Sequence, residues 1–182
     1  MWPSTEFRFG HLAGVELVTG LGSEPHLRWR TFCDTGATRA ERVHAHRVVM
    51  LGAFLSDVVY SRPVEVTGFA TDPAELERLG VGHSSYEGPT GILGVLGDRL
   101  ARDGRDVLSL WACLPHYLDS TPNPRGALAL VDKVSAYLGI RVDDAELRTE
   151  AEDFEKRVSE IVAADPELSE YVRQLKKRDF AQ

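Results

Sequence analysis

Short apolar runs divide the first part of the chain into segments of strand length. They predict three buried strands, at residues 14–20, 47–54 and 106–114. Residues 63–70 instead alternate apolar and polar side chains, which predicts a fourth strand with one exposed face or a place near a sheet edge. The run at residues 14–20 is bounded by glycines, as the ends of strands often are.

Helical spacing of apolar residues fills the intervals between these runs. It predicts helices over residues 25–42, 89–103 and 124–138, and a short helix opened by Asp72 and Pro73. Strands that alternate with helices are typical of an α/β fold, in which crossover helices flank the sheet. We therefore expect an α/β domain whose sheet is mostly parallel, with right-handed crossovers.

The pattern changes after residue 140, where no further strand is predicted. A long amphipathic helix is expected from Val142 to Ala164, and Asp165 and Pro166 open a second helix with its own apolar stripe. The two form a helical hairpin. We therefore divide the chain into an α/β domain, residues 1–140, and a C-terminal helical extension, residues 141–182. The apolar stripe must cover either the sheet layer or a neighbouring subunit.

Composition and charge exclude several classes of partner. The 182 residues include 28 acidic and 21 basic ones, a net charge of −7, which argues against a nucleic-acid partner or an anionic membrane surface. The apolar runs are too short to span a bilayer, and the N-terminus does not have the order of a secretory signal. The two cysteines, Cys33 and Cys113, are expected as buried free thiols. We expect a cytoplasmic protein.

Standard catalytic motifs are missing from the sequence. It has no phosphate-binding GxxxxGK[ST] loop and no GxSxG elbow, and Pro25 stands where a dinucleotide fingerprint that begins at Gly20 would need its third glycine. His44 and His46 have no partner ligands at a recognised spacing. We therefore expect no cofactor and no metal site, and we assign no catalytic residue.

Polar residues beside the predicted strand ends are the candidates for a ligand site. A helix that begins near Pro89, capped by Thr90 or Ser85, presents free N–H groups that favour an anion. In α/β sheets ligands collect at strand ends. The candidate ligand-binding residues are Glu24, Arg62, Glu87, Gly88, Thr90, Gly91 and His116. The structural alternative is that Glu24 caps the following helix, Arg62 pairs with a carboxylate, and His116 hydrogen-bonds the backbone.

Several short motifs, in this order and spacing, resemble one known family. They are Gly22-Ser23-Glu24-Pro25, Ser61-Arg62-Pro63-Val64, the segment 86–91 (YEGPTG), Leu110-Trp111-Ala112, Pro115-His116-Tyr117 and Pro122-Asn123-Pro124. The chain thereby resembles the PAC-two (proteasome assembly chaperone two) family, and in particular its bacterial branch, common in actinobacteria and often labelled as ATP-grasp.

The resemblance implies a phosphorylase/hydrolase-like α/β fold with a helical C-terminal extension, and homo-oligomers. It implies no settled reaction, although eukaryotic and archaeal relatives are associated with proteasome assembly. Two departures matter. Such proteins carry a further strand–helix–strand unit ahead of the Glu24-Pro25 motif, so we expect either an open sheet edge that favours association or a truncated reading of a longer protein. The nucleotide-binding elements of ATP-grasp ligases are missing from the sequence.

Three functions follow as hypotheses. The first, which we favour, is a non-catalytic, homo-oligomeric interaction or assembly-chaperone-like protein, with a trimer among the states considered and a protein partner. The alternative is a small-molecule binder or hydrolase/nucleosidase-type enzyme with a pocket at the strand ends. An ATP-dependent carboxylate–amine ligase ranks last.

Overall fold

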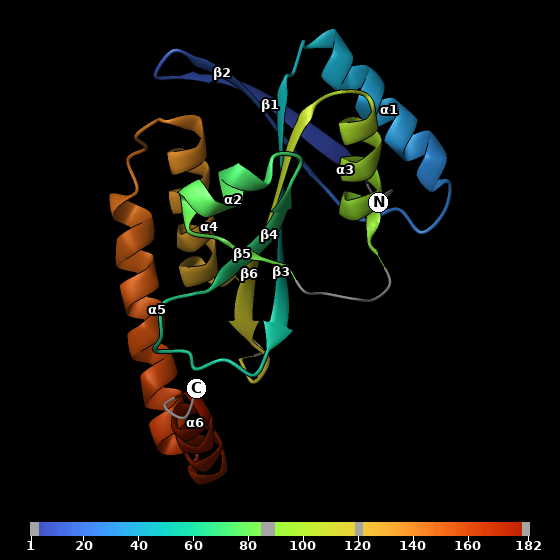
Figure 1. Ribbon diagram of the computed structural model, residues 1–182. Helices are drawn as coiled ribbons and strands as arrows, with labels where there is room; N and C mark the ends of the chain where they lie inside the picture. Colours follow the sequence, from blue (N-terminus) through green and yellow to red (C-terminus); the bar gives the residue numbers. More distant parts are fainter. Residues whose placement is uncertain (1–3, 85–89, 119–121, 180–182) are drawn as a thin grey trace.

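The main sheet has four strands in the part of the chain that the computed structural model describes, residues 4–84, 90–118 and 122–179. Their spatial order is β3 (Arg47–Ser56), β6 (Asp106–Pro115), β4 (Val66–Ala70) and β5 (Gly82–His83). Figure 1 shows the sheet between two groups of helices, with a separate hairpin of strands at one end and two C-terminal helices at the other. The predicted α/β architecture is therefore confirmed.

The sheet is mixed, so the expectation of a mostly parallel sheet is not confirmed. β3 and β6 run parallel, from Arg47 beside Asp106 to Ser56 beside Pro115, whereas β4 runs antiparallel to β6. The reason lies in the loop of residues 57–65, which contains no helix. Without a crossover helix, the chain leaving β3 turns back and re-enters the sheet in the opposite direction.

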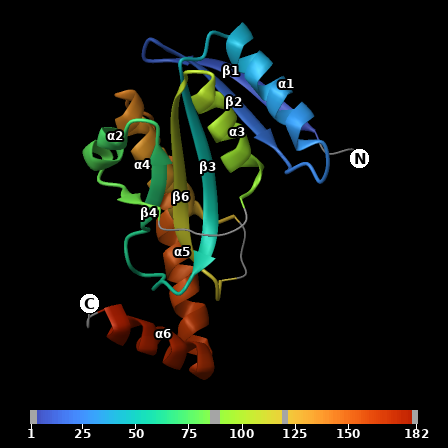
Figure 2. The same ribbon diagram turned by 45° about the vertical axis from the view of Figure 1, so that its right-hand side comes forward.

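Helices cover the two faces of this sheet. α1 (Trp29–Arg42) and α3 (Ile92–Arg102) lie on one face, and α2 (Pro73–Leu79) and α4 (Pro124–Leu138) lie on the other (Figure 2). β6 lies between two neighbouring strands and under both layers. Its residues Leu108 and Leu110 are 1% and 0% exposed, because a central strand of an α/β sheet is apolar on both faces. The predicted buried strand at residues 106–114 is confirmed.

A two-stranded hairpin, β1 (Thr5–Leu12) and β2 (Val15–Gly22), stands apart from the main sheet. The sequence predicted a buried strand at residues 14–20. The strand exists, but the predicted burial was wrong, since Val18 is 40% and Leu21 of the same strand 77% exposed. β1 was not predicted, because charged residues interrupt its apolar pattern. The strand pairs outside the core. Ala13 and Gly14 both have positive φ, which is the geometry of a tight two-residue hairpin turn.

The C-terminal segment forms the predicted helical hairpin, α5 (Ala145–Ala164) and α6 (Pro166–Asp179). Its apolar stripe, which includes Phe154 and Val158, packs against Val172 of α6 and against Tyr60 and Tyr117 at the end of the sheet. α5 also packs along α4. The stripe therefore covers the body of the same chain. None of the helices in the described part of the chain is long and apolar enough to cross a membrane.

Candidate functional site

Glu24 holds the start of a helix that follows it by 68 residues. Its Oε1 accepts a hydrogen bond from the backbone N–H of Ile92 at 2.6 Å. The N-cap residue of α3 is Gly91, whose lack of a side chain leaves the first N–H groups without a local cap. The partial positive charge at this helix start therefore receives a carboxylate of the same chain. The structural alternative for Glu24 named the wrong helix, since it caps α3 and not α1.

The rest of the predicted anion-binding turn is described only in part. Glu87 and Gly88 lie outside the described residues, as do Ser85 and Pro89. Thr90 is exposed, and α3 begins after Gly91, so the helix start falls later than predicted and Thr90 is not the N-cap residue. Gly91 lies against the Glu24 carboxylate, because a Cβ at this position would stand 3.2 Å from Oε1. A ligand role for this turn stays a prediction.

His116 belongs to a cluster that fastens the C-terminal hairpin to the end of the sheet. Its Nδ1 lies 3.1 Å from Oδ1 of Asp57 and 3.4 Å from the carbonyl oxygen of Ser56. The Tyr171 hydroxyl of α6 donates to the same Asp57 oxygen at 2.9 Å. The rings of His116, Tyr117 and Tyr171 meet edge to face, with centroids 5.5 to 5.6 Å apart. We call Asp57, His116 and Tyr171 the clasp.

Tyr117 extends this cluster into the loop after β3. Its hydroxyl donates to the carbonyl oxygen of Val58 at 2.9 Å and accepts from the backbone N–H of Tyr60 at 3.0 Å. Burial raises the pKa of Tyr117 to about 12, since ionisation would place a charge where water solvates it poorly. The phenol is therefore neutral at physiological pH and serves as a structural hydrogen-bond bridge.

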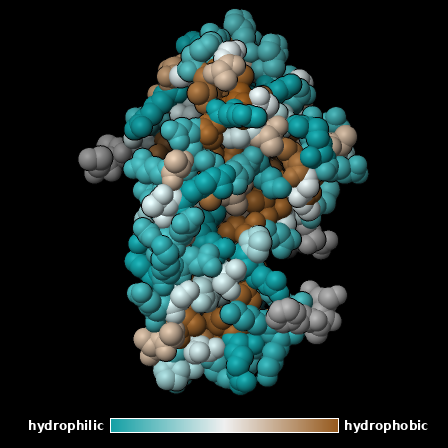
Figure 3. Space-filling view, turned by 90° about the vertical axis from the view of Figure 1, so that its left-hand side faces the viewer, coloured by the Kyte–Doolittle hydropathy of each residue, from teal (hydrophilic) through white to brown (hydrophobic). Residues whose placement is uncertain are grey.

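Arg62 lies on a pocket between the same loop and α6. The guanidinium is 3.9 Å from the Asp179 carboxylate, and the backbone carbonyl of Arg62 accepts from Arg125 at 2.7 Å. The pocket has a volume of about 410 Å³, and its lining includes Val59, Arg62, Val64, Glu65, Cys113 and Asp179. Figure 3 shows a hollow between the α/β body and the C-terminal hairpin.

Glu24, Arg62 and His116 are the described candidates with charged or titratable side chains. They do not converge on one cavity, and each makes its own local contacts. Arg62 and His116 lie at the same end of the sheet and both reach α6, whereas Glu24 holds the N-terminus of α3. The salt bridge expected for Arg62 and the backbone contact expected for His116 are present. Asp57, Tyr117 and Tyr171 were missed, although Asp57 follows the apolar run of β3 directly, which is the signal that could have found it.

The cysteine near the pocket is a poor nucleophile. Cys113 is buried and free, as is Cys33, so the expected thiol state of both is confirmed. Burial raises the pKa of the Cys113 thiol, mainly because the thiolate would be desolvated. Since the thiolate is the reactive form, Cys113 is protonated and unreactive at neutral pH. No group of three His, Cys, Asp or Glu side chains able to hold a metal occurs among the described residues.

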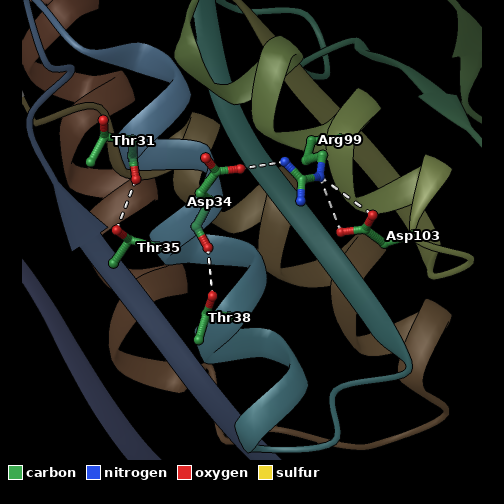
Figure 4. A network of polar contacts seen from close by, with 6 residues as sticks. All are labelled: Thr31, Asp34, Thr35, Thr38, Arg99 and Asp103. Carbon is green, nitrogen blue, oxygen red and sulfur yellow. Dashed lines mark hydrogen bonds and ion pairs between the residues drawn. The ribbon is translucent and has the colours of Figure 1, made fainter.

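A second polar cluster joins α1 to α3 on the opposite side of the molecule (Figure 4). Arg99 of α3 forms an ion pair with Asp34 of α1, and its Nε lies 3.3 Å from the carboxylate of Asp103. The hydroxyls of Thr35 and Thr38 each donate to a carbonyl oxygen one turn earlier in α1. These exposed contacts fix two surface helices to one another, and they include no group poised for chemistry.

Comparison with known proteins points to one family. The model of the PAC2 family matches residues 1–162. A proteasome-assembly chaperone homologue of Mycobacterium tuberculosis is 38% identical, with a TM-score of 0.84 over 94% of this chain and 73% of that one. A PAC2 family protein of Streptomyces avermitilis is 36% identical, with the same TM-score and coverage.

A more distant solved structure shares the fold. An archaeal homolog of proteasome-assembly chaperone from Pyrococcus furiosus is 22% identical, with a TM-score of 0.61 over 85% of this chain and 73% of that one. A search of curated proteins found no match. The ATP-grasp label is not supported by these similarities.

Proposed function

Because this chain belongs to the PAC2 family, we propose that it is a non-catalytic, homo-oligomeric, assembly-chaperone-like protein that acts in the cytoplasm by binding other proteins. Solved structures similar to this chain include a proteasome-assembly chaperone homologue and an archaeal proteasome activator. We extend this to a partner class: subunits of a proteasome-like particle.

The clasp is the observation that carries this proposal. His116, the candidate best suited to acid–base chemistry, is engaged with Asp57, and Asp57 in turn accepts a hydrogen bond from Tyr171 of α6. These contacts position the C-terminal hairpin against the end of the sheet. A fixed helical arm beside the α/β domain is suited to contact a partner, since a preorganised surface loses less conformational entropy on binding. In this proposal residues 141–182 are the binding extension of domain 1–140.

The test is reconstitution with purified proteasome α-type subunits of Mycobacterium tuberculosis, the source of the 38% identical relative. We expect a complex in size-exclusion chromatography with light scattering. Asp57→Ala should weaken it about tenfold, because the arm loses its fixed position. Glu16→Ala, an exposed change on the β1–β2 hairpin, is the matched control and should have no effect. A mixture that elutes as two separate species at about 50 µM of each protein contradicts the proposal.

A second candidate function rests on the pocket at the strand ends. Its volume of about 410 Å³ suits a small molecule, and Arg62 and Glu65 offer groups of opposite charge beside apolar walls. This is the small-molecule or hydrolase/nucleosidase alternative, to which the phosphorylase/hydrolase-like interpretation of the fold belongs. A thermal-shift screen with nucleosides, nucleotides and small carboxylates tests it, since binding raises the melting temperature. An unchanged melting temperature throughout the screen argues against it, and nucleotide binding that requires magnesium would revive the ligase hypothesis.

A further inference from the structure

Part of the sheet face beneath α1 and α3 is open among the described residues. The β3 and β6 side chains that pack against these helices are Val48, Met50 and Val107, all in the first half of their strands. Figure 2 shows both helices at the end of the sheet nearest the β1–β2 hairpin. Outside the area that they cover, Phe54 of β3 is 41% exposed and Phe69 of β4 is 51% exposed. Two phenyl rings of the main sheet therefore reach water.

The strand register places four side chains of β4 and β6 together on this face. Residues that pair across neighbouring strands point to the same side of a sheet, and the side alternates along each strand. Val107 packs with α1 and α3, so Trp111 lies on the same side, and its partner in β4 is Thr67. Phe69 follows Thr67 by two residues. Glu65 precedes it by two, and the Glu65 carbonyl oxygen accepts an N–H of β6 at 2.9 Å. We call Glu65, Thr67, Phe69 and Trp111 the open face.

The Trp111 indole lies along the sheet. Its Nε1 donates to the Ser109 hydroxyl of the same strand at 2.9 Å. Its six-membered ring lies over Gly52 of β3, where an added Cβ would collide with it. The indole is half-buried and is held at both ends, so it presents part of its π surface away from the backbone. Such a surface attracts cations, and tryptophan does so more strongly than the other aromatic residues.

Glu65 supplies the charge of the open face. Its side chain is exposed, and the carboxylate makes no hydrogen bond or ion pair with any described residue. Arg62, which lines the same pocket, is engaged with Asp179. The carboxylate leans toward β6: burial is the main cause of the raised pKa of the Cys113 thiol, and the nearby Glu65 charge adds to it. An unpaired carboxylate beside aromatic rings is complementary to an organic cation.

We propose that the open face binds an arginine side chain of a partner protein, with the guanidinium between the Glu65 carboxylate and the rings of Phe69 and Trp111. The inference rests on the proposed protein-binding function and names the chemistry of one contact. Arginine fits better than lysine, because its planar group stacks on a ring and pairs with both carboxylate oxygens. The side chain can approach past β5, since Gly82, the partner of Thr67, has no side chain.

The exposure of the open face favours a protein as the source of the cation. Two of its four side chains, Glu65 and Phe69, are exposed, so a free cation would keep much of its contact with water and bind weakly. An arginine within a larger interface loses that water to its neighbours, which is why arginine is frequent among the residues that dominate binding energy. The net charge of −7 also favours a partner with a basic surface.

The first experiment measures binding of the isolated side chain to the full chain. N-acetyl-arginine amide is titrated while two-dimensional NMR follows the indole N–H of Trp111, assigned by its loss in Trp111→Phe. We expect a saturable shift with a dissociation constant on the order of 1–10 mM. N-acetyl-lysine amide should bind about threefold more weakly. No saturable shift up to about 50 mM, or an equal response to neutral N-acetyl-glutamine amide, would overturn the inference.

The second experiment uses matched substitutions in the same titration. Glu65→Gln keeps the shape of the side chain and removes its charge, so it should weaken arginine binding about tenfold. Glu16→Gln, at an exposed position of the separate hairpin, should change it by less than about twofold. Phe69→Leu removes a ring and should weaken binding about threefold, whereas Phe9→Leu, at a position 72% exposed on the hairpin, should not. Circular dichroism confirms that each variant folds. Equal effects within either pair contradict the inference.

The same variants separate this inference from the proposed function. In the complex with proteasome subunits, Glu65→Gln should weaken association about tenfold and Glu16→Gln should not. A complex that Glu65→Gln leaves unchanged overturns the inference, and the proposed function stands. Absence of any complex contradicts the proposed function, whereas the arginine amide titration does not depend on the subunits. A shift of the Trp111 signal when the protein alone is concentrated would assign the open face to a second copy and refute the inference.

Discussion

Removal of the Glu24 carboxylate should destabilise the whole fold through a helix that is remote in sequence. In the native chain, Oε1 of Glu24 accepts the N–H of Ile92 at 2.6 Å, and the N-cap residue Gly91 has no side chain to replace it. Glu24→Ala leaves this N–H to water and removes the negative charge from the helix N-terminus. Glu24→Gln keeps an acceptor and removes the charge alone, so the two variants separate the two effects.

The magnitude follows from these two contributions. Loss of an N-terminal cap costs about 1 kcal/mol, and loss of a favourable charge at a helix N-terminus costs about 0.3–1 kcal/mol. We therefore expect Glu24→Ala to lower the free energy of unfolding by about 1.5 kcal/mol and Glu24→Gln by about 0.5 kcal/mol. For a chain of this size, the larger loss corresponds to a decrease in melting temperature of roughly 3–6 °C.

The assay is urea unfolding followed by circular dichroism, at one fixed protein concentration because association would shift the midpoint. Glu16→Ala, which removes an exposed carboxylate from the separate hairpin, controls for the change in net charge. A loss from Glu24→Ala no larger than that of the control would refute the capping argument. A gain in stability would instead favour a ligand role for Glu24, since functional groups are often held at a cost in stability.

Three further changes test the fold. Tyr117→Phe should cost about 1–2 kcal/mol in urea unfolding, because one hydroxyl serves two backbone groups. In the native chain the pKa of Tyr117 is raised to about 12 from near 10 in the unfolded state. Its contribution is thus complete below pH 10 and is lost as the pH rises to 12, which absorbance titration at 295 nm will follow. Gly68→Ala should destabilise by about 1–3 kcal/mol, since its Cβ would collide with a β6 carbonyl oxygen, whereas Gly10→Ala, with open space around it, should be nearly neutral by thermal unfolding. Leu175→Ala should cost about 2–5 kcal/mol, and Ile161→Ala less than about 0.5 kcal/mol, because the two side chains are 1% and 57% exposed.

The sequence predicted the strands and helices whose apolar pattern and capping residues lie within the segment itself. β6 is apolar throughout because both of its faces are covered, and α4 begins with a proline after a capping Asn123. The C-terminal hairpin likewise shows its apolar stripe and its break at Asp165. Local pattern suffices in these cases, since each residue's environment is set by its own strand or helix.

The candidate site was predicted less completely because its contacts join distant segments. His116 follows the last residue of β6 and Arg62 lies in the loop before β4, but their partners Tyr171 and Asp179 come from α6. The direction of β4 was missed for the same reason, although a loop without a helix was visible in the sequence.

The sequence by itself determined the alternation of strands and helices, the helical extension and the PAC2 resemblance, because these depend on local periodicity and on the order of motifs. Only the tertiary structure decided that the carboxylate at the start of α3 belongs to Glu24, that the clasp binds α6 to the sheet, and that the outer edge of β3 pairs with no strand among the described residues. The physical reason is that hydrogen bonds and strand edges depend on which segments meet in space. Periodicity along one segment does not show which other segments contact it.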